Sequence, residues 1–236
     1  MLTNITGKPG VLTTYIAQPR ELFYSSRANA HFLPGPLTVD GTLSGNAANA
    51  PYTWLLFAGM PVGRVTSSGK YATSILGATT SATAANATTV QTDVNTAAEI
   101  IRRIGTSGTF KLTGPPAAGG TVAIQVVTYS AVNTTSGAIT CSAASDAAIS
   151  GSLIQPADGS ETIITLIADT WGLKVIDALN STRVDVFDPE LWAGGGIVNT
   201  GMIVNYPADS SLKAWLKASI RTLIADAKFQ DDLVNT

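Results

Sequence analysis

The sequence predicts a mainly β fold with a minor helical part. Short runs of β-branched and aromatic residues, separated by Gly and Pro, recur through the middle of the 236-residue chain. Only two segments show helical periodicity, a short one near residue 100 and a longer one at the C-terminus. A hydrophobic fraction of 45% supplies enough apolar material for a core. A β-rich chain of this length often forms a single domain.

The first 50 residues are expected to form an extended N-terminal arm and linker. They show neither the period of a helix nor that of a strand, and prolines interrupt them repeatedly. Residues 41–50 read as a small polar linker. We expect this arm to lie on the surface of another protein. The alternative is an arm folded back over its own core.

Residues 51–208 are expected to form the β-rich domain. Residues 52–76 predict two short strands around a turn at Ser67–Gly69, and residues 77–94 read as a loop with at most one weak edge strand. Strict alternation begins at residue 108. Residues 122–132 and 138–143 predict a hairpin within an inserted region of about 116–150. Further strands are expected at residues 153–154, 163–167, 173–176, 184–187 and 197–204.

Two helices are expected. The internal helix has a capping box at Thr96 and Glu99, and Gly105 ends it. The second occupies residues 209–236, where Asp209 or Ser210 can cap the first turn.

The C-terminal helix carries two distinct faces. Its apolar stripe includes Trp215, Leu216 and Ile220, which are expected to pack on the core or on a sister subunit. Three basic residues form a separate ridge, at positions Lys213, Lys217 and Arg221. A solvated surface is the favoured interpretation of this ridge, and contact with an acidic neighbouring subunit is the alternative.

The composition argues against catalysis. The chain has one histidine, His31, and one cysteine, Cys141, so it can form neither an intrachain disulfide nor a His-rich or Cys-rich metal site. The segment 63–70 resembles a phosphate-binding loop only superficially. Five residues separate its glycines, and Tyr71 stands where the motif needs Ser or Thr. We therefore predict that the protein is not an enzyme, has no catalytic residues and binds no cofactor.

Two groups of acidic residues are candidates for a cation site or for catalytic carboxylates. Asp185, Asp188 and Glu190 could coordinate a hard cation such as calcium, but they lack the spacing of an EF-hand loop, so solvated loop carboxylates are favoured. Asp158 and Glu161 are three residues apart, and Asp158 precedes a glycine. This pair reads as a turn rather than as glycosidase carboxylates.

The charge and hydropathy patterns exclude two classes of partner. A net charge of −2 provides no basic surface for nucleic acid. No window approaches the roughly 18 continuous apolar residues that a membrane helix needs. The N-terminus lacks the order of a secretory signal, so we expect synthesis in the cytoplasm.

Two segments resemble a known family. Residues 56–76, which contain AGMPVGRVTSSGK, and residues 106–112, TSGTFKL, are similar to β segments of the head-decoration (capsid cement) proteins of tailed bacteriophages, of the lambda protein D type. The resemblance implies a compact β-barrel or β-tulip core with an N-terminal arm. It also implies a virion protein, made in the bacterial host cytoplasm, that binds the outer surface of the expanded capsid and clamps adjacent major capsid subunits, commonly as a homotrimer.

On this hypothesis the arm contacts the capsid through its aromatic residues and one cation, namely Tyr15, Arg20, Phe23 and Tyr24. The chain is longer than the smallest family members, and its extra hairpin and C-terminal helix leave the trimeric state and the lattice position open. The main alternative is a carbohydrate-binding or adhesin-like β module on a phage or cell surface. Such a module would share the Thr-rich composition and would display aromatic residues in an exposed groove.

Overall fold

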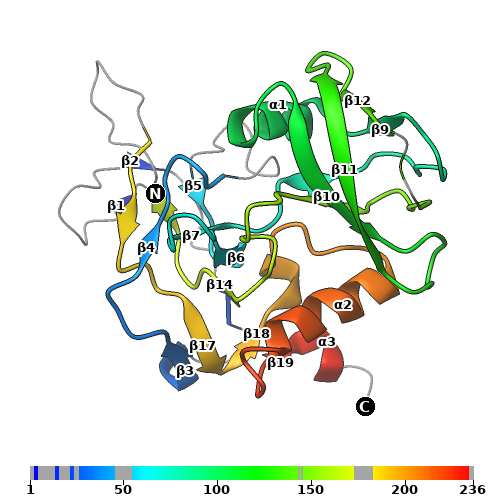
Figure 1. Cartoon of the computed structure of the whole chain (residues 1–236). Helices are drawn as coiled ribbons and strands as arrows, with labels where there is room; N and C mark the ends of the chain where they lie inside the picture. The colour runs from blue at the N-terminus through cyan, green and yellow to red at the C-terminus, as the bar shows by residue number, and fades with distance from the viewer. Residues whose placement is uncertain are drawn as a thin grey trace.

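The computed structural model describes residues 3–4, 14–15, 22–23, 27–45, 55–142, 144, 146–172 and 183–233. In this part of the chain the fold is mainly β, with a six-stranded sheet, a five-stranded sheet and several two-stranded pairs (Figure 1). Three buried apolar clusters accompany them: one inside the larger sheet, one at the smaller sheet, and one where the described N-terminal residues meet the C-terminal helices. The predicted fold class is confirmed.

The larger sheet is curled, and we refer to it as the curled sheet. Its strands follow the order β8-β13-β10-β11-β12-β9, with every neighbouring pair antiparallel. The strands are β8 (Gly77–Ala78), β9 (Thr89–Gln91), β10 (Gly108–Gly114), β11 (Ala123–Val132), β12 (Ala138–Cys141) and β13 (Leu153–Gln155). An isolated bridge between Thr79 and Thr92 links the ends of the two edge strands. The sheet therefore curls into a half-barrel, and this single bridge joins its two edge strands at one end.

The predicted hairpin lies at the centre of this sheet. The turn from Asn133 to Gly137 joins β11 to β12, and Gly137 donates its N–H to the Asn133 carbonyl at 2.8 Å. Gly137 has φ +75°, and a Cβ there would lie 2.0 Å from the Thr92 carbonyl oxygen, so the turn requires glycine. β11 pairs with β10 along its length, from Ala123 to Tyr129. The region 116–150 therefore supplies central strands of the sheet and is not an appendage to it.

The internal helix, α1 (Val94–Arg103), packs against the inside of the curled sheet through Ile100. Its N-cap is Asp93, whose carboxylate accepts from the N–H of Asn95 and Thr96. The predicted capping box at Thr96 is therefore wrong by three residues. An Asp side chain accepts two backbone N–H groups here and places negative charge at the positive end of the helix.

The smaller sheet has the order β14-β6-β7-β4-β16. Its strands are β14 (Thr165–Leu166), β6 (Pro61–Arg64), β7 (Tyr71–Thr73), β4 (Thr38–Val39) and β16 (Val186–Phe187). The predicted turn joins β6 to β7, and β5 (Leu55–Leu56) pairs separately with β15 (Trp171–Gly172). The expected strand at 173–176 lies outside the described residues.

The C-terminal part contains α2 (Ser210–Arg221), with Asp209 as its N-cap as predicted. The helix ends at Arg221, and the chain continues through β19 (Lys228–Phe229) into α3 (Gln230–Leu233), so residues 209–236 do not form one helix. β19 pairs with β18 (Ile197–Val198), and β17 (Trp192–Gly195) pairs with β3 (Ala30–Phe32); the 3-10 turns are η1 (Arg27–Asn29) and η3 (Thr200–Met202). None of the described helices is both long and apolar enough to cross a bilayer.

The predicted packing face of α2 is largely confirmed. Leu216 and Ile220 are 0% exposed in a cluster that we call the terminal core. Trp215 lies against the same cluster but is only partly buried. Figure 1 shows α2 beneath the lower end of β11, with α1 near the opposite end of that strand.

The separate arm expected for residues 1–50 is not found where that segment is described. Leu22 is 1% exposed and Phe23 is 7% exposed, and both lie in the terminal core. The Phe23 ring centre lies 6.2 Å from that of Trp192, and Val39 is buried within the smaller sheet. The alternative of a segment folded back on its own core is correct for residues 22–23 and 27–45, because the core offers these apolar side chains aromatic and aliphatic partners.

Candidate functional site

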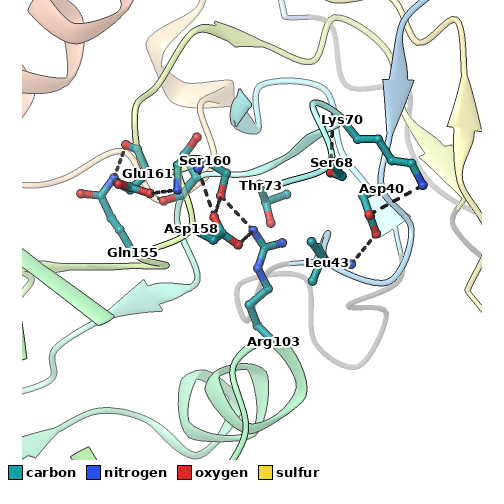
Figure 2. Close-up of polar contacts among 12 residues, drawn as sticks. Asp40, Leu43, Ser68, Lys70, Thr73, Arg103, Gln155, Asp158, Ser160 and Glu161 are labelled. Atoms are coloured by element: carbon teal, nitrogen blue, oxygen red, sulfur yellow. Dashed lines mark hydrogen bonds and ion pairs between the residues drawn. The ribbon is translucent and has the colours of Figure 1, made fainter. Parts of the chain in front are cut away.

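Asp158 and Glu161 lie in the loop after β13, and Figure 2 shows their contacts. Asp158 accepts a hydrogen bond from Nη2 of Arg103 at 2.9 Å through Oδ2 and one from the Ser160 hydroxyl at 2.7 Å through Oδ1. The same Nη2 also donates to the Ser160 oxygen at 2.8 Å. Three side chains therefore hold the loop against the last turn of α1.

Arg103 makes this contact from a buried position. Its side chain is 1% exposed, against 32% for its partner Asp158. Burial lowers the pKa of Arg103, while the nearby Asp158 carboxylate opposes that shift. A buried guanidinium needs a counter-charge, so Asp158 is required to keep α1 and the loop together.

Glu161 serves the same loop from its other end. One carboxylate oxygen accepts from Lys111 Nζ at 2.7 Å, and the other accepts from the N–H of Gly159 at 2.6 Å. Gly159 has φ +104°, and a Cβ there would lie 2.1 Å from the Thr66 hydroxyl oxygen, so the tight approach requires glycine. Both carboxylates of the pair are engaged by fixed donors of the protein, which supports the prediction of a turn.

A second polar group joins the loop after β4 to the hairpin β6–β7. Lys70 Nζ lies 2.7 Å from Asp185 and 3.9 Å from Asp40. Burial raises the pKa of Asp40, but hydrogen bonds from Thr42 and Leu43, with Lys70 nearby, outweigh burial and lower it. The lysine of the segment that resembles a phosphate loop is therefore part of a structural ion pair (Figure 2).

The candidate calcium residues do not converge. Asp185 accepts from the N–H of Gly41 and pairs with Lys70, whereas Asp188 accepts from the N–H of Leu37 at 3.2 Å. Within the described ranges, no group of three or more His, Cys, Asp or Glu side chains is placed to hold a metal ion. The expectation of solvated loop carboxylates also needs correction for Asp185, because a lysine neutralises it.

The single cysteine and the single histidine lie apart in the fold. Cys141 is 6% exposed in β12, and burial raises the pKa of its thiol. This matches the predicted small buried strand residue. His31 lies in β3 with an exposed side chain.

The basic ridge of α2 is matched by acids of the same chain. Lys217 pairs with Asp231 at 3.0 Å and with Asp232, and Arg221 also pairs with Asp232. Lys213 lies over the ring of Tyr206, 5.7 Å from its centre. Neither expected interpretation is correct in full, since α3 supplies the counter-charge that was sought in solvent or in another subunit.

A groove of about 220 Å³ lies between α2 and the outer face of the curled sheet. Its lining comprises the apolar side chains Ile124, Ile163, Trp215 and Leu223 and the polar residues Lys111, Gln155, Glu161, Thr162, Ser219 and Thr222. Three large apolar side chains on or beside this groove are strongly exposed: Ile124 at 53%, Val126 at 64% and Leu223 at 59%. Val126 lies on the same outer face of β11, opposite Lys111 of β10.

The sequence alone does not predict this groove. One signal was present: β11 carries Ile124 and Val126 on one face and Val127 and Tyr129 on the other, so apolar side chains occupy both faces of one strand. A half-buried strand normally has a polar outer face. Which face lies beside α2 depends on the tertiary fold.

The residues expected to contact a capsid have separate locations. The backbone of Tyr15 lies in β2 (Thr14–Tyr15), where it pairs with Thr3 of β1 (Thr3–Asn4). Arg20 and Tyr24 lie outside the described residues. Phe23 is buried in the terminal core and is not available as a surface contact.

Comparisons of the chain with protein-family models, with curated proteins and with solved structures gave no match. The function must therefore be inferred from the residues of the chain itself.

Proposed function

We propose that this chain is a structural virion protein of a tailed phage. It binds the outer surface of the expanded capsid and stabilises the shell by clamping adjacent major capsid subunits. No reaction and no cofactor are part of this proposal. The protein associates with itself as a homotrimer and with the major capsid protein, and it neither binds nucleic acid nor inserts into a membrane.

One observation carries the proposal. The two segments that resemble the cement family reach opposite edges of the same strand, β13, although 29 residues separate them in the chain. The N–H of Leu76, at the end of the first segment, donates to the Ile154 carbonyl at 2.8 Å. Ile154 of β13 pairs in register with Leu112, at the end of the second segment. All three side chains are 0% exposed in the core of the curled sheet. The second segment supplies β10 of the curled sheet, whereas most of the first segment forms β6 and β7 of the smaller sheet and only its end, at Leu76, enters this core. This shared buried cluster supports the compact β core that the resemblance implies.

The physical requirements of a cement protein agree with this fold. Such a protein needs a rigid body and complementary surfaces, and interfaces of about 1,200–2,000 Å² suffice for stable association. Many copies on one lattice strengthen attachment, because each shell subunit is then held by several contacts. Among the residues expected to contact the shell, Tyr15, Arg20 and Tyr24 remain candidates.

The alternative of a carbohydrate-binding module is favoured by one feature, the partly exposed Trp215 in the groove. The polar groups around it argue against a sugar. Lys111 donates to Glu161, and the hydroxyls of Ser219 and Thr222 donate to carbonyls of their own helix. A sugar site needs donors and acceptors that are free to meet its hydroxyls.

A binding experiment tests the proposal against this alternative. Purified protein is mixed with expanded head shells assembled without it, and in parallel with a panel of immobilised glycans. We expect saturable binding to shells, density at symmetry-related positions by electron cryomicroscopy, and a higher shell disruption temperature. Glycan binding without shell binding would contradict the proposal.

A further inference from the structure

We propose that the groove between α2 and the outer face of β10–β11 is the surface with which this protein docks on an uncharged, apolar segment of a capsid subunit. This inference rests on the proposed function and deepens it, because it assigns the contact to particular residues. It moves the expected contact from the N-terminal segment to the junction of two folded elements.

The exposed area of the groove is mostly apolar, and Val126 lies beside it on the same face of β11. Ile124, Val126 and Leu223 each expose more than half of their surface, and Trp215 lies partly exposed between the helix and the sheet. Two of these side chains come from β11, and the others come from α2 and the turn just after it. These segments are remote in sequence, so their proximity is a property of the fold. Contiguous apolar surface of this kind marks interaction sites on soluble proteins.

Most polar side chains of the groove already hydrogen-bond or pair within the protein, and the exposed Thr162 is the polar side chain that this does not cover. Gln155 is 1% exposed, its amide nitrogen donates to the carbonyls of Ser74 and Glu161, and its oxygen accepts from Thr113. Little hydrogen-bonding capacity therefore remains for a polar ligand. Burial of apolar surface is therefore the main favourable contribution to the free energy of binding in this groove.

The charges around the groove select the chemistry of the occupant. Lys111 is paired with Glu161 at 2.7 Å, and Lys217, on the next face of α2, is paired with Asp231 and Asp232. Beyond Val126, the outer face of β11 continues through Thr128 and Ser130 without a charged residue. A charged partner would lose solvation here without gaining a counter-charge. The complement of this surface is therefore an uncharged apolar segment, inserted as an anchor in the way that dominates many protein interfaces.

The test uses three lysine substitutions at exposed positions. Ile124→Lys and Leu223→Lys place an ammonium group at the groove, and Thr140→Lys places the same charge on the outer face of β12, away from it. All three sites are exposed, so melting temperatures are expected to stay near that of the wild type. Binding to expanded shells assembled without this protein is measured by co-sedimentation at graded concentrations.

We expect the two groove variants to bind shells at least about tenfold more weakly, because docking would have to desolvate an unpaired charge. Thr140→Lys should bind like the wild type. Wild-type affinity should change less than about threefold between 0.05 and 0.5 M NaCl, because no net charge pairs form across the interface.

Each other outcome has a distinct meaning. Wild-type binding that persists unchanged in both groove variants would overturn the groove inference and leave the proposed function standing. A wild type that fails to bind shells would overturn both. If the groove variants instead change the sedimentation coefficient of the free protein, the groove is a contact between copies of this chain, and docking on a capsid segment is wrong.

Discussion

The curled sheet and the terminal core are built in opposite ways. Strands β10 to β13 of the curled sheet follow one another in the chain, and its cluster draws only on residues 76–154. The terminal core instead collects Phe23, Trp192 and Phe229, whose ring centres lie 6.2 to 6.4 Å apart in successive pairs. The curled sheet is therefore organised mainly by pairing between successive strands, and the terminal core by contacts between distant parts of the chain.

The largest expected loss of stability comes from truncating a buried aromatic side chain in each region. Trp192 and Phe110 are both 0% exposed, and Trp192→Ala or Phe110→Ala should each lower the free energy of unfolding by about 3–5 kcal/mol. Urea unfolding measures the loss, and native-state hydrogen exchange shows where it falls. If the regions are separate cooperative units, Trp192→Ala reduces protection mainly in α2, and Phe110→Ala mainly in β10 and β11. Uniform loss in both variants would show one cooperative unit.

The second-largest expected loss of stability comes from breaking the ion pair between Arg103 of α1 and Asp158 of the loop after β13. Asp158→Ala leaves the buried guanidinium of Arg103 without its counter-charge and should cost about 3 kcal/mol, near the lower end for a broken buried pair because Asp158 is partly exposed. Arg103→Met, which removes the charge but keeps the volume, should cost less. Chemical denaturation of both variants tests this order. A larger loss in Arg103→Met would mean that packing, rather than charge, holds the junction.

The two helix caps form a matched pair with smaller effects. Asp93→Ala at α1 and Asp209→Ala at α2 should each cost about 1 kcal/mol. We expect the greater loss at Asp209, because its other carboxylate oxygen accepts from the N–H of Gly119 in the loop between β10 and β11, whereas that of Asp93 accepts from the Thr96 hydroxyl of its own helix. Thermal unfolding at constant pH measures the difference, with Asp→Asn at each site as the control that keeps an acceptor. Equal losses would show that the contact with Gly119 adds no more stability than the bond from Thr96 to Asp93.

The smallest expected change in stability comes from Asp232, which pairs with Lys217 and Arg221 of the basic ridge. Burial raises the pKa of Asp232, but hydrogen bonds from Lys217 and Arg221 outweigh it and lower that pKa. A carboxyl whose folded pKa is lowered stabilises the fold above its unfolded pKa of about 3.9, and this contribution is lost as the pH falls through the folded value. Asp232→Asn should therefore cost about 0.2–1 kcal/mol at neutral pH and progressively less in acid.

Melting curves of the wild type and Asp232→Asn between pH 2 and pH 7 would measure this convergence. The difference at neutral pH should also shrink in 0.5 M NaCl, since the pairs are partly exposed and salt screens them. A difference that stayed constant across the pH range would show that the ion pairs do not account for it.

Local pattern and turn chemistry predicted much of the fold. The alternation of β11, the turn at 133–137, the β6–β7 hairpin and the cap at Asp209 all follow from residues near one another in the chain. The start of α1 was misplaced because two nearby sites can cap a helix, and only the structure shows Asp93 meeting both N–H groups. Short strands such as β18 were expected to be longer, since their length depends on a distant partner, β19.

Periodicity and local turn residues predicted the β-rich class, the central hairpin, the apolar face of α2 and the burial of Cys141. Three features could be read only from the folded chain: Phe23 lies in the terminal core, Asp158 neutralises a buried arginine, and Asp231 and Asp232 pair with the basic ridge. The groove beside α2 belongs to this second group. Long-range contacts are set by which surfaces exclude water together when the whole chain collapses, and no local pattern encodes that pairing.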